Sequence, residues 1–588
     1  MVTPSGPGPR SPLGSGRSVG LLAVGDGTAV GAGGAELDPG GAAVEPRGVE
    51  VGVVNGSARS TAPVVQPATS PVRASASTIA RTAGRRAVVA LIEPLSPAGR
   101  PKRPGRRTTE VDHTKERDRP QPAPALEGVW STTPVTSGPG SGAHDRAATG
   151  TGTGVAYDLV GIAEEAAGTR LPIRVRAWDG SEAGAPAGPD VPLVLIRSRR
   201  ALRHLIWRPG ELGLARAYVT GELDLEGDLT DGLRRVWRAV RERPAAPTQS
   251  RRDQLLARAR AVRTVARLGA IGPRPPRPAS ESRLTGRLHT TFRDRAAISH
   301  HYDLSNAFYQ LLLDPQMAYS CAYWPADDPT YPLEAAQRDK LDLVCRKLAL
   351  TEGSRLLDVG CGWGSLALHA AQHYGARVVG VTLSVEQRDF VRARAAERGV
   401  ADRLDIRLQH YRDVPDSGFD AVSSIEMGEH VGRREYVDFA ARLHGFLRPQ
   451  GRLLVQQMSR NGTAPGGGPF IETYIAPDMH MKSLATTIGL LEDAGLEIRE
   501  VQAMREHYPR TVRAWLATLE ARWDDAVAIV GVEVARVWRL YLAGGALAFE
   551  ENRMGVDQIL AVRPDADGGS GLPWTPRSWR VEPGTGPA

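Results

Sequence analysis

A glycine-rich turn between an apolar strand and a helix constrains the fold of this chain more than any other feature. The sequence LLDVGCGWG occupies residues 356–364. The apolar run at 355–359 predicts a buried strand, and the pattern at 364–374 predicts a helix. Glycines in such a turn let the backbone approach a bound ligand closely, beside the amino end of the helix. The turn therefore predicts a nucleotide-type ligand at one edge of a sheet.

The spacing of these glycines separates two classes of ligand. A dinucleotide-binding turn has the pattern G-x-G-x-x-G, with an acidic residue about 20 positions later for the ribose. Here the pattern is G-x-G-x-G, Asp358 precedes the first glycine, and the sequence TLS at 382–384 stands in place of the acid. We interpret the turn as a site for S-adenosylmethionine rather than for a nicotinamide cofactor.

Strands and helices alternate through the second half of the chain. Besides 355–359, strands are predicted at 377–382, 404–408, 419–425 and 451–458, and helices at 385–398 and 434–446. Such alternation is typical of a mostly parallel sheet covered by helices. We predict one α/β domain over residues 285–564.

A smaller region precedes this domain. Residues 171–176 alternate apolar and polar side chains like a half-buried strand, and residues 191–197 form a denser apolar run. A short helix is predicted at 198–207. We assign residues 155–240 to a small α+β domain.

The two ends of the chain differ in composition from the rest. Residues 1–154 are dominated by Gly, Pro, Ala, Ser, Thr and Arg, and Trp130 is their only aromatic residue. Such a segment cannot bury enough apolar surface to offset the entropy of ordering it. We predict disordered tails at 1–154 and 565–588. The first either has no function of its own or results from a start codon placed too far upstream.

Residues 241–284 form a predicted basic linker. From position 234 to position 295 the chain has seventeen Arg and four acidic residues. Apolar residues recur there at helical spacing. They are Leu255, Ala259, Val262 and Ala266. This helix either packs on the second domain as an ordinary connection or rests on an anionic membrane surface. Nucleic acid is the least favoured partner, because no nucleic-acid-binding motif accompanies the charge.

What the sequence lacks argues against several other classes of protein. No apolar run approaches the ~20 residues of a membrane-spanning helix, and no secretory signal is recognisable. The three cysteines suggest neither a disulfide framework nor a zinc site. His300, His301 and Asp303 could ligate a metal, but neighbours in an extended chain point apart, and methyl transfer needs no metal. We expect a cytoplasmic, reduced protein without a bound metal.

Five motifs in a fixed order carry a resemblance to a known family. They are ISHHYDLSNAFYQLLLDPQMAYSCAYW at 298–324, LLDVGCGWG at 356–364, GVTLSVEQ at 380–387, YRD at 411–413 and EMGEHVG at 426–432. Together they resemble the cyclopropane-fatty-acyl-phospholipid synthase family, which includes the mycolic acid cyclopropane synthases. The similarity covers about residues 157–564. It implies a class I methyltransferase (Rossmann-like) fold, a small amino-terminal lipid-binding domain and S-adenosylmethionine as the methyl donor.

The resemblance assigns the cofactor contacts residue by residue. They are Tyr319, Ser320, Gly360, Gly362, Gly364, Thr382, Leu383, Ser384, Gln387, Tyr411 and Arg412. The chemistry agrees, since Gln387 can hydrogen-bond ribose hydroxyls through its amide. Asp358 would accept hydrogen bonds from the amino-acid end of the cofactor or fix the turn. Tyr302 and Trp324 either face the sulfonium by cation–π attraction or are ordinary core aromatics.

The resemblance also implies a bound bicarbonate, with Cys321, Glu429 and Tyr508 as three of its ligands. An alkene that attacks the donor methyl becomes a carbocation, which must lose a proton to close a three-membered ring. A base near that carbon stabilises the cation and removes the proton. Beside such an anion, Glu429 is expected to have a raised pKa and to donate a hydrogen bond.

One position of the bicarbonate site departs from the family pattern. Gln456 stands where the family usually has a histidine. Glutamine can hydrogen-bond an anion, but it cannot carry a positive charge or shuttle a proton. Two products therefore stay open, because the cation could instead shift a hydride and yield a methylene-branched chain.

The expected function is methylation of the double bond of an unsaturated fatty-acyl chain of a phospholipid, forming a cyclopropane ring. A methylene- or methyl-branched product is the first alternative. A methyltransferase for a small soluble acceptor and an inactive lipid-binding protein are the others. The expected partners are the phospholipid, an anionic membrane surface on whose inner face the enzyme is peripheral, and a second copy in a homodimer.

Overall fold

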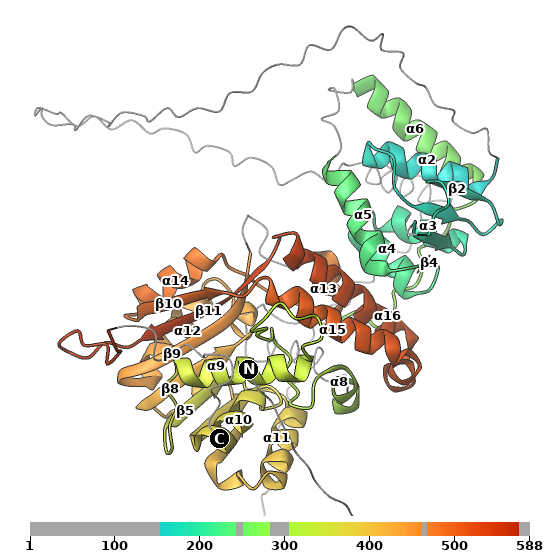
Figure 1. Ribbon diagram of the computed structural model, residues 1–588. Coiled ribbons are helices and arrows are strands. Elements are labelled where there is room, and N and C mark those ends of the chain that lie inside the picture. The colour runs from blue at the N-terminus through green and yellow to red at the C-terminus, as the bar shows by residue number, and fades with distance from the viewer. Residues whose placement is uncertain (1–152, 190, 243–250, 283–304, 461–466, 575–588) are drawn as a thin grey trace, which may run out of the picture. The chain divides into compact units, whose positions relative to one another are not determined.

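The computed structural model describes residues 153–189, 191–242, 251–282, 305–460 and 467–574 (Figure 1). Almost all of the predicted amino-terminal tail lies outside the described residues. So do residues 243–250 and 283–284 of the predicted linker and residues 575–588 of the predicted carboxy-terminal tail.

A seven-stranded sheet forms the centre of the larger region. Its strands are β5 (Arg355–Val359), β6 (Arg377–Thr382), β7 (Leu404–Leu408), β8 (Phe419–Ile425), β9 (Leu447–Ser459), β10 (Glu497–Ala503) and β11 (Gly555–Val562). The strand order is β10-β11-β9-β8-β5-β6-β7. The five strands from β9 to β7 in this order are parallel, whereas β11 runs antiparallel to both β9 and β10. This mostly parallel sheet is the class I methyltransferase fold, as predicted.

Helices cover both faces of the sheet. Those on one face are α9 (Leu333–Lys347), α10 (Ser365–Tyr374) and α11 (Val385–Glu397), and those on the other are α12 (Glu435–Phe446) and α14 (Leu484–Asp493). Side chains of a strand point alternately to the two faces, so Leu356 packs in the first apolar layer and Leu357 in the second. Both faces of β5, β6 and β8 are buried, and these strands therefore read as nearly continuous apolar runs.

The strands around the glycine-rich turn have the predicted bounds. β5, β6, β7 and β8 match the prediction, and β9 begins at Leu447 rather than at position 451. β10 and β11 were not predicted. They extend the sheet beyond β9 on the side away from the turn.

Three further helices gather aromatic side chains beside the turn. They are α8 (Asn306–Leu312), α15 (His507–Ala521) and α16 (Trp523–Glu550), which is kinked at Gly531 (φ 79°). The aromatic residues of this cluster include Tyr309, Tyr319, Trp363, Trp515 and Trp538. The rings of Tyr309 and Trp363 lie 4.2 Å apart, so the cluster reaches the glycine-rich turn itself.

The smaller, amino-terminal region is α+β, as predicted. A four-stranded sheet has the order β2-β1-β3-β4. Its strands are β1 (Arg174–Arg176), β2 (Glu182–Gly184), β3 (Leu193–Ile196) and β4 (Leu223–Glu226), and its helices are α2 (Val155–Ala167), α3 (Arg199–Trp207), α4 (Glu211–Val219) and α5 (Leu229–Arg241). Ser198 accepts a hydrogen bond from Arg200 N and so caps α3. The predicted strands at 171–176 and 191–197 are both present in shortened form.

The linker contains the predicted helix, α6 (Arg251–Arg267), but its buried side is not the predicted one. Leu255, the first residue of the predicted apolar stripe, is 63% exposed. The buried side chains are Ala257, Ala261 and Val265. Val265 packs with the core of the small region rather than with the second domain. Two ion pairs hold the helix on the same region: Arg267 pairs with Asp158 of α2, and Arg260 pairs with Glu165 of α2.

Candidate active site

The glycine-rich turn adopts a backbone that side chains disfavour. Gly360, Gly362 and Gly364 have φ angles of 81°, 54° and 76°, in the left-handed region where glycine carries no steric cost. A Cβ on Gly360 would lie 2.8 Å from Met427 Cγ, whereas one on Gly362 would meet nothing within 4 Å. Gly362 therefore presents bare backbone to open space, as close approach of a ligand requires.

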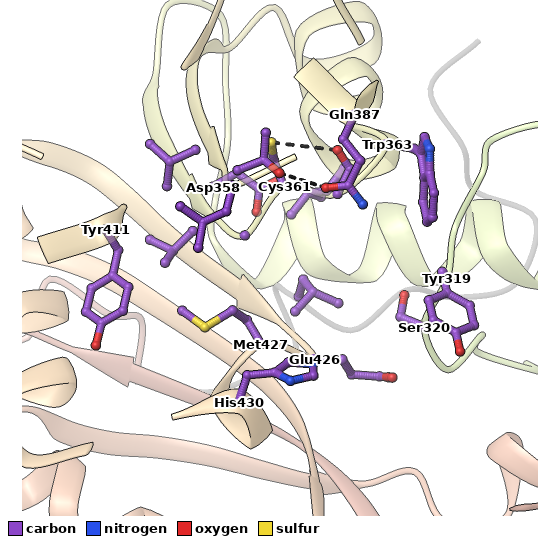
Figure 2. Close-up of a pocket in the computed structure, with 18 of the residues that line it drawn as sticks. Tyr319, Ser320, Asp358, Cys361, Trp363, Gln387, Tyr411, Glu426, Met427 and His430 are labelled. Carbon is purple, nitrogen blue, oxygen red and sulfur yellow. Dashed lines mark hydrogen bonds between the residues drawn. The ribbon is translucent and has the colours of Figure 1, made fainter. Parts of the chain in front are cut away.

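A pocket opens beside this turn at the carboxyl ends of β5, β6 and β8 (Figure 2). Most of the predicted cofactor contacts line it. They are Tyr319, Ser320, Asp358, Gly360, Gly362, Thr382, Leu383, Gln387, Tyr411 and Arg412. Two others support it from behind: Gly364 packs on Val391, and Ser384 accepts a hydrogen bond from Gln387 N at the start of α11.

Two polar side chains at the pocket are fixed by the ends of neighbouring strands. Thr382 Oγ1 donates to Gln387 Oε1 at 2.7 Å, which sets the direction of the Gln387 amide. Ser423 Oγ of β8 donates to Asp358 Oδ1 at 2.8 Å. Burial raises the pKa of Asp358 to about 6, although the Ser423 hydrogen bond lowers it.

Lys340 of α9 is a pocket residue that the sequence did not reveal. Its side chain is buried, and its Nζ donates to Ser320 Oγ at 2.8 Å. Gln337, one turn earlier, donates to the carbonyl oxygens of Ala318 and Ser320. The helix thereby holds the segment that carries Tyr319 and Ser320 against the pocket. The sequence feature that could have identified Lys340 is a lysine placed among the apolar residues of a core helix.

Glu426 is the second residue that the sequence did not reveal, and it joins the pocket to a buried polar cluster. It directly follows β8, lines the pocket and is partly buried. Its Oε1 accepts hydrogen bonds from Cys321 N at 2.8 Å and from Gln456 Nε2 at 2.9 Å. Its Oε2 accepts from the hydroxyl of Tyr508. Burial raises the pKa of Glu426, and these three hydrogen bonds oppose the rise.

Three of the four predicted catalytic residues, Cys321, Gln456 and Tyr508, thus come together around Glu426. The fourth, Glu429, lies close enough to Glu426 to feel its charge. None of the four predicted residues lines the pocket itself; Glu426 connects them to it. Its Oε1 accepts a hydrogen bond from Met458 N, and its Oε2 has no partner among the described residues. Burial and the neighbouring Glu426 raise the pKa of Glu429 to about 8. The pKa of Glu429 is thus raised as expected, but the neighbouring negative charge comes from the Glu426 side chain rather than from bicarbonate.

The Cys321 side chain is not arranged as an anion. Its Sγ is buried and donates to Ala322 O at 3.3 Å. Burial, with Glu426 next in effect, raises the pKa of this thiol well above its usual range. Cys321 therefore serves the cluster through its backbone N–H, and the thiol stays neutral.

Two other predicted positions have different outcomes. Trp324 does not line the pocket: its Nε1 donates to His507 O and Thr511 Oγ1, so it is a core aromatic as the second interpretation had it. Tyr302 lies outside the described residues, as do His300, His301 and Asp303. Across the described ranges, no helix is both long and apolar enough to cross a membrane.

Comparisons with known proteins agree with the site. Residues 289–559 match the family model described as mycolic acid cyclopropane synthetase. A probable fatty acid methyltransferase of Pseudomonas putida is 38% identical over 411 residues, which are 69% of this chain and 95% of that protein. The cyclopropane-fatty-acyl-phospholipid synthase of Escherichia coli K12 is 35% identical over 263 residues, 45% of this chain and 66% of that protein.

Solved structures are also similar to part of this chain. The cyclopropane synthase MmaA2 of Mycobacterium tuberculosis is 32% identical, covers 47% of this chain and 99% of its own, and gives a TM-score of 0.44. The identity to the Pseudomonas putida protein extends over nearly all of that relative. This chain therefore belongs to the mycolic acid cyclopropane synthetase family, and it is an S-adenosylmethionine-dependent fatty acid methyltransferase of the cyclopropane synthase type.

Proposed function

We propose that this enzyme methylates the double bond of an unsaturated fatty-acyl chain that is part of a membrane phospholipid. The observation that carries the proposal is the position of Glu426. Its carboxylate lies on the wall of the cofactor pocket and is held there by three hydrogen bonds. A double bond that accepts a methyl cation becomes positively charged, and a fixed carboxylate in a water-poor site stabilises that charge.

The pocket residues fit S-adenosylmethionine. Gly362 leaves open space for the close approach of a ligand, Gln387 would hold the ribose, and Asp358 would receive the amino group. Tyr411 and Arg412, which also line the pocket, would contact the base. When bound, this cofactor supplies an electrophilic methyl group. The aromatic residues Tyr319 and Trp515, with rings 5.4 Å apart, would keep water from the reacting carbon.

A cyclopropane ring is the product we propose first. A base beside the acyl chain would take a proton from the newly added methyl carbon, and ring closure would neutralise the cation. A methylene-branched chain is the second candidate. It is favoured by Gln456, which replaces a histidine of the family pattern, and by the name fatty acid methyltransferase of the Pseudomonas putida relative.

The substrate would be reached at an anionic membrane surface. On α6, Leu255 and Leu256 are 63% and 52% exposed, and Arg252, Arg260 and Arg263 of the same helix are exposed as well. Apolar and basic side chains together on an exposed helix favour anionic lipid. The small region at 155–240 would bind the lipid, and a homodimer remains a prediction.

Expression in a bacterial host rich in unsaturated phospholipids tests this function. Mass spectrometry of the fatty-acid esters should show acyl chains heavier by one CH2, absent from cells that express Gly360→Ala. Catalytic hydrogenation separates the products, since a ring under mild conditions keeps its mass whereas a methylene branch gains two hydrogens. Purified enzyme that methylates only small soluble acceptors, or that binds lipid without turnover, would reject the proposal.

A further inference from the structure

We propose that the side chain of Glu426 takes the place of the bicarbonate that the family pattern implies, and is the base that removes the proton from the alkylated acyl chain. This inference rests on the proposed function, which it deepens by assigning the base. Glu426 is neither a bicarbonate ligand of the family pattern nor one of the residues predicted from the sequence.

The first argument is that three of the four expected anion ligands, all except Glu429, are already engaged. Cys321 N and Gln456 Nε2 donate to Oε1 of Glu426, and Tyr508 donates to Oε2. Tyr508 and the Cys321 backbone have one proton each to donate, and the second proton of the Gln456 amide is directed at Cys321 O, at 3.3 Å. The residues present therefore do not fit a separate bicarbonate, since three of its four expected ligands already donate to a carboxylate of the chain.

The second argument is the orientation of Gln456. Gln558 Nε2 of β11 donates to Gln456 Oε1 at 2.9 Å. The amide oxygen is thereby turned toward β11, and its NH2 group is turned toward Glu426. Both glutamines are buried. Two neighbouring strands thus fix a neutral donor on the carboxylate, an arrangement that a free ion would not need.

The third argument is the cost of a second anion. Burial and the charge of the neighbouring Glu426 already raise the pKa of Glu429. A bicarbonate would add another negative charge to a site with little water, where like charges repel strongly. The nearest buried cation at the pocket is Lys340, which donates to Ser320 rather than to Glu426.

The fourth argument is the backbone of Glu426. Its φ angle is 50°, in the left-handed region that non-glycine residues rarely adopt. Its N–H donates to Gln456 O at 2.6 Å, so the strained residue is held by the same strand that supplies the amide donor. Figure 2 shows Glu426 at the pocket between Met427 and Ser320. Strain of this kind persists where surrounding structure holds a functional group in place.

The proton transfer balances without another reactant. A C–H bond of the added methyl carbon breaks, and the proton passes to a Glu426 oxygen. The electron pair of that bond forms the new carbon–carbon bond of the ring, which neutralises the cation. In the branched alternative, a hydride first shifts within the chain and the pair forms a carbon–carbon double bond. Glu426 ends as a neutral acid and returns its proton to water after product leaves.

The test compares wild type, Glu426→Gln and Glu426→Gly, with Glu500→Gln as a control at a partly exposed carboxylate that does not line the pocket. Glutamine keeps the volume of the side chain. Glycine accepts the φ angle of 50° and opens space for an ion. Turnover is measured on unsaturated phospholipid vesicles in buffer freed of carbon dioxide, then with added bicarbonate. S-adenosylmethionine binding is measured by calorimetry, and binding of ¹³C-bicarbonate by NMR without lipid.

We expect wild type and Glu500→Gln to turn over equally with and without bicarbonate. Glu426→Gln should bind S-adenosylmethionine as wild type does and lose roughly 10²–10⁴-fold in turnover. Glu426→Gly should be equally slow without bicarbonate, bind the labelled ion, and recover at least tenfold when it is added. Wild type should not bind the ion.

Two results would overturn the inference: wild type that binds ¹³C-bicarbonate or stops without it, or Glu426→Gln with turnover within threefold of wild type. Wild type that methylates no lipid would instead reject the proposed function. The NMR comparison of wild type with Glu426→Gly would still decide whether the side chain occupies the place of the ion, since it needs neither lipid nor turnover.

Discussion

Replacing Glu429 by Gln should make the stability of the protein less sensitive to alkaline pH. Glu429 is 1% exposed, and one of its oxygens has no partner among the described residues. Burial and Glu426 raise its pKa from 4.5 to about 8. The folded protein therefore keeps the proton on Glu429 to about pH 8, whereas the unfolded chain releases it near pH 4.5.

The sign and size of the effect follow from proton linkage. Between pH 4.5 and 8 the folded state binds more protons, so stability is fully present below pH 4.5 and is lost as pH rises through 8. A rise of about 3.5 pH units, at about 1.4 kcal/mol per unit, amounts to about 5 kcal/mol. Glutamine resembles the neutral acid in shape and does not titrate, so the variant should avoid this loss.

Urea unfolding followed by tryptophan fluorescence at pH 5, 7 and 9 measures the effect. The stability of Glu429→Gln relative to wild type should increase by several kcal/mol from pH 5 to pH 9. Glu352→Gln, at a side chain that is 79% exposed, should keep the wild-type pH dependence. A stability difference between Glu429→Gln and wild type that does not change with pH would refute the reasoning, because Glu429 would then be ionised throughout.

Three further predictions concern the cofactor turn, the linker helix and the amino-terminal tail. Gly360→Ala should weaken S-adenosylmethionine binding at least tenfold by calorimetry, since φ is 81° and Met427 Cγ blocks a Cβ at 2.8 Å; Gly445→Ala, with nothing within 4 Å, should not. The double variant Leu255→Ser, Leu256→Ser should sediment less with anionic vesicles than wild type does. Vesicle binding of wild type should also fall as salt is added, because the Debye length shortens to ~3 Å at 1 M. Equal binding of wild type to neutral and anionic vesicles would exclude electrostatic attraction. A chain that begins at position 153 should keep wild-type turnover, because Val155 N and Ala156 N are hydrogen-bonded to Asp179 and Ser181; loss of turnover in a folded truncation would give the tail a role.

The sequence predicted the local parts of the fold well. β5, β6 and β8 have their predicted bounds because each is a short, mostly apolar run with both faces buried. β7 was found because apolar and polar residues alternate along it. β10 and β11 gave weaker signals. β10 is an edge strand with its side chains partly exposed, and β11 places the polar residues Asp557 and Gln558 inside the protein.

The same distinction applies to the site. The residues around the glycine-rich turn are close in sequence or follow neighbouring parallel strands, so motif spacing located most of the pocket. Glu426 depends on contacts with residues 321, 456 and 508, which only the folded chain brings together. The α6 helix shows a related limit. Its spacing predicted a helix correctly, but Leu255 and Val265 lie on different sides, and the core of the small region decides which side is buried.

The Gln456 departure has a different meaning once Glu426 is placed beside it. Taken alone, the loss of a histidine that could carry charge or shuttle a proton argues for a weakened enzyme. Beside a built-in carboxylate, a cationic partner would lower the pKa of the base and make it poorer at accepting a proton. A neutral amide, turned by Gln558, holds the carboxylate in place and leaves its basicity high. Gln456 and Glu426 thus work together in the proposed reaction: the carboxylate serves as the base, and the side chain that holds it is a neutral donor.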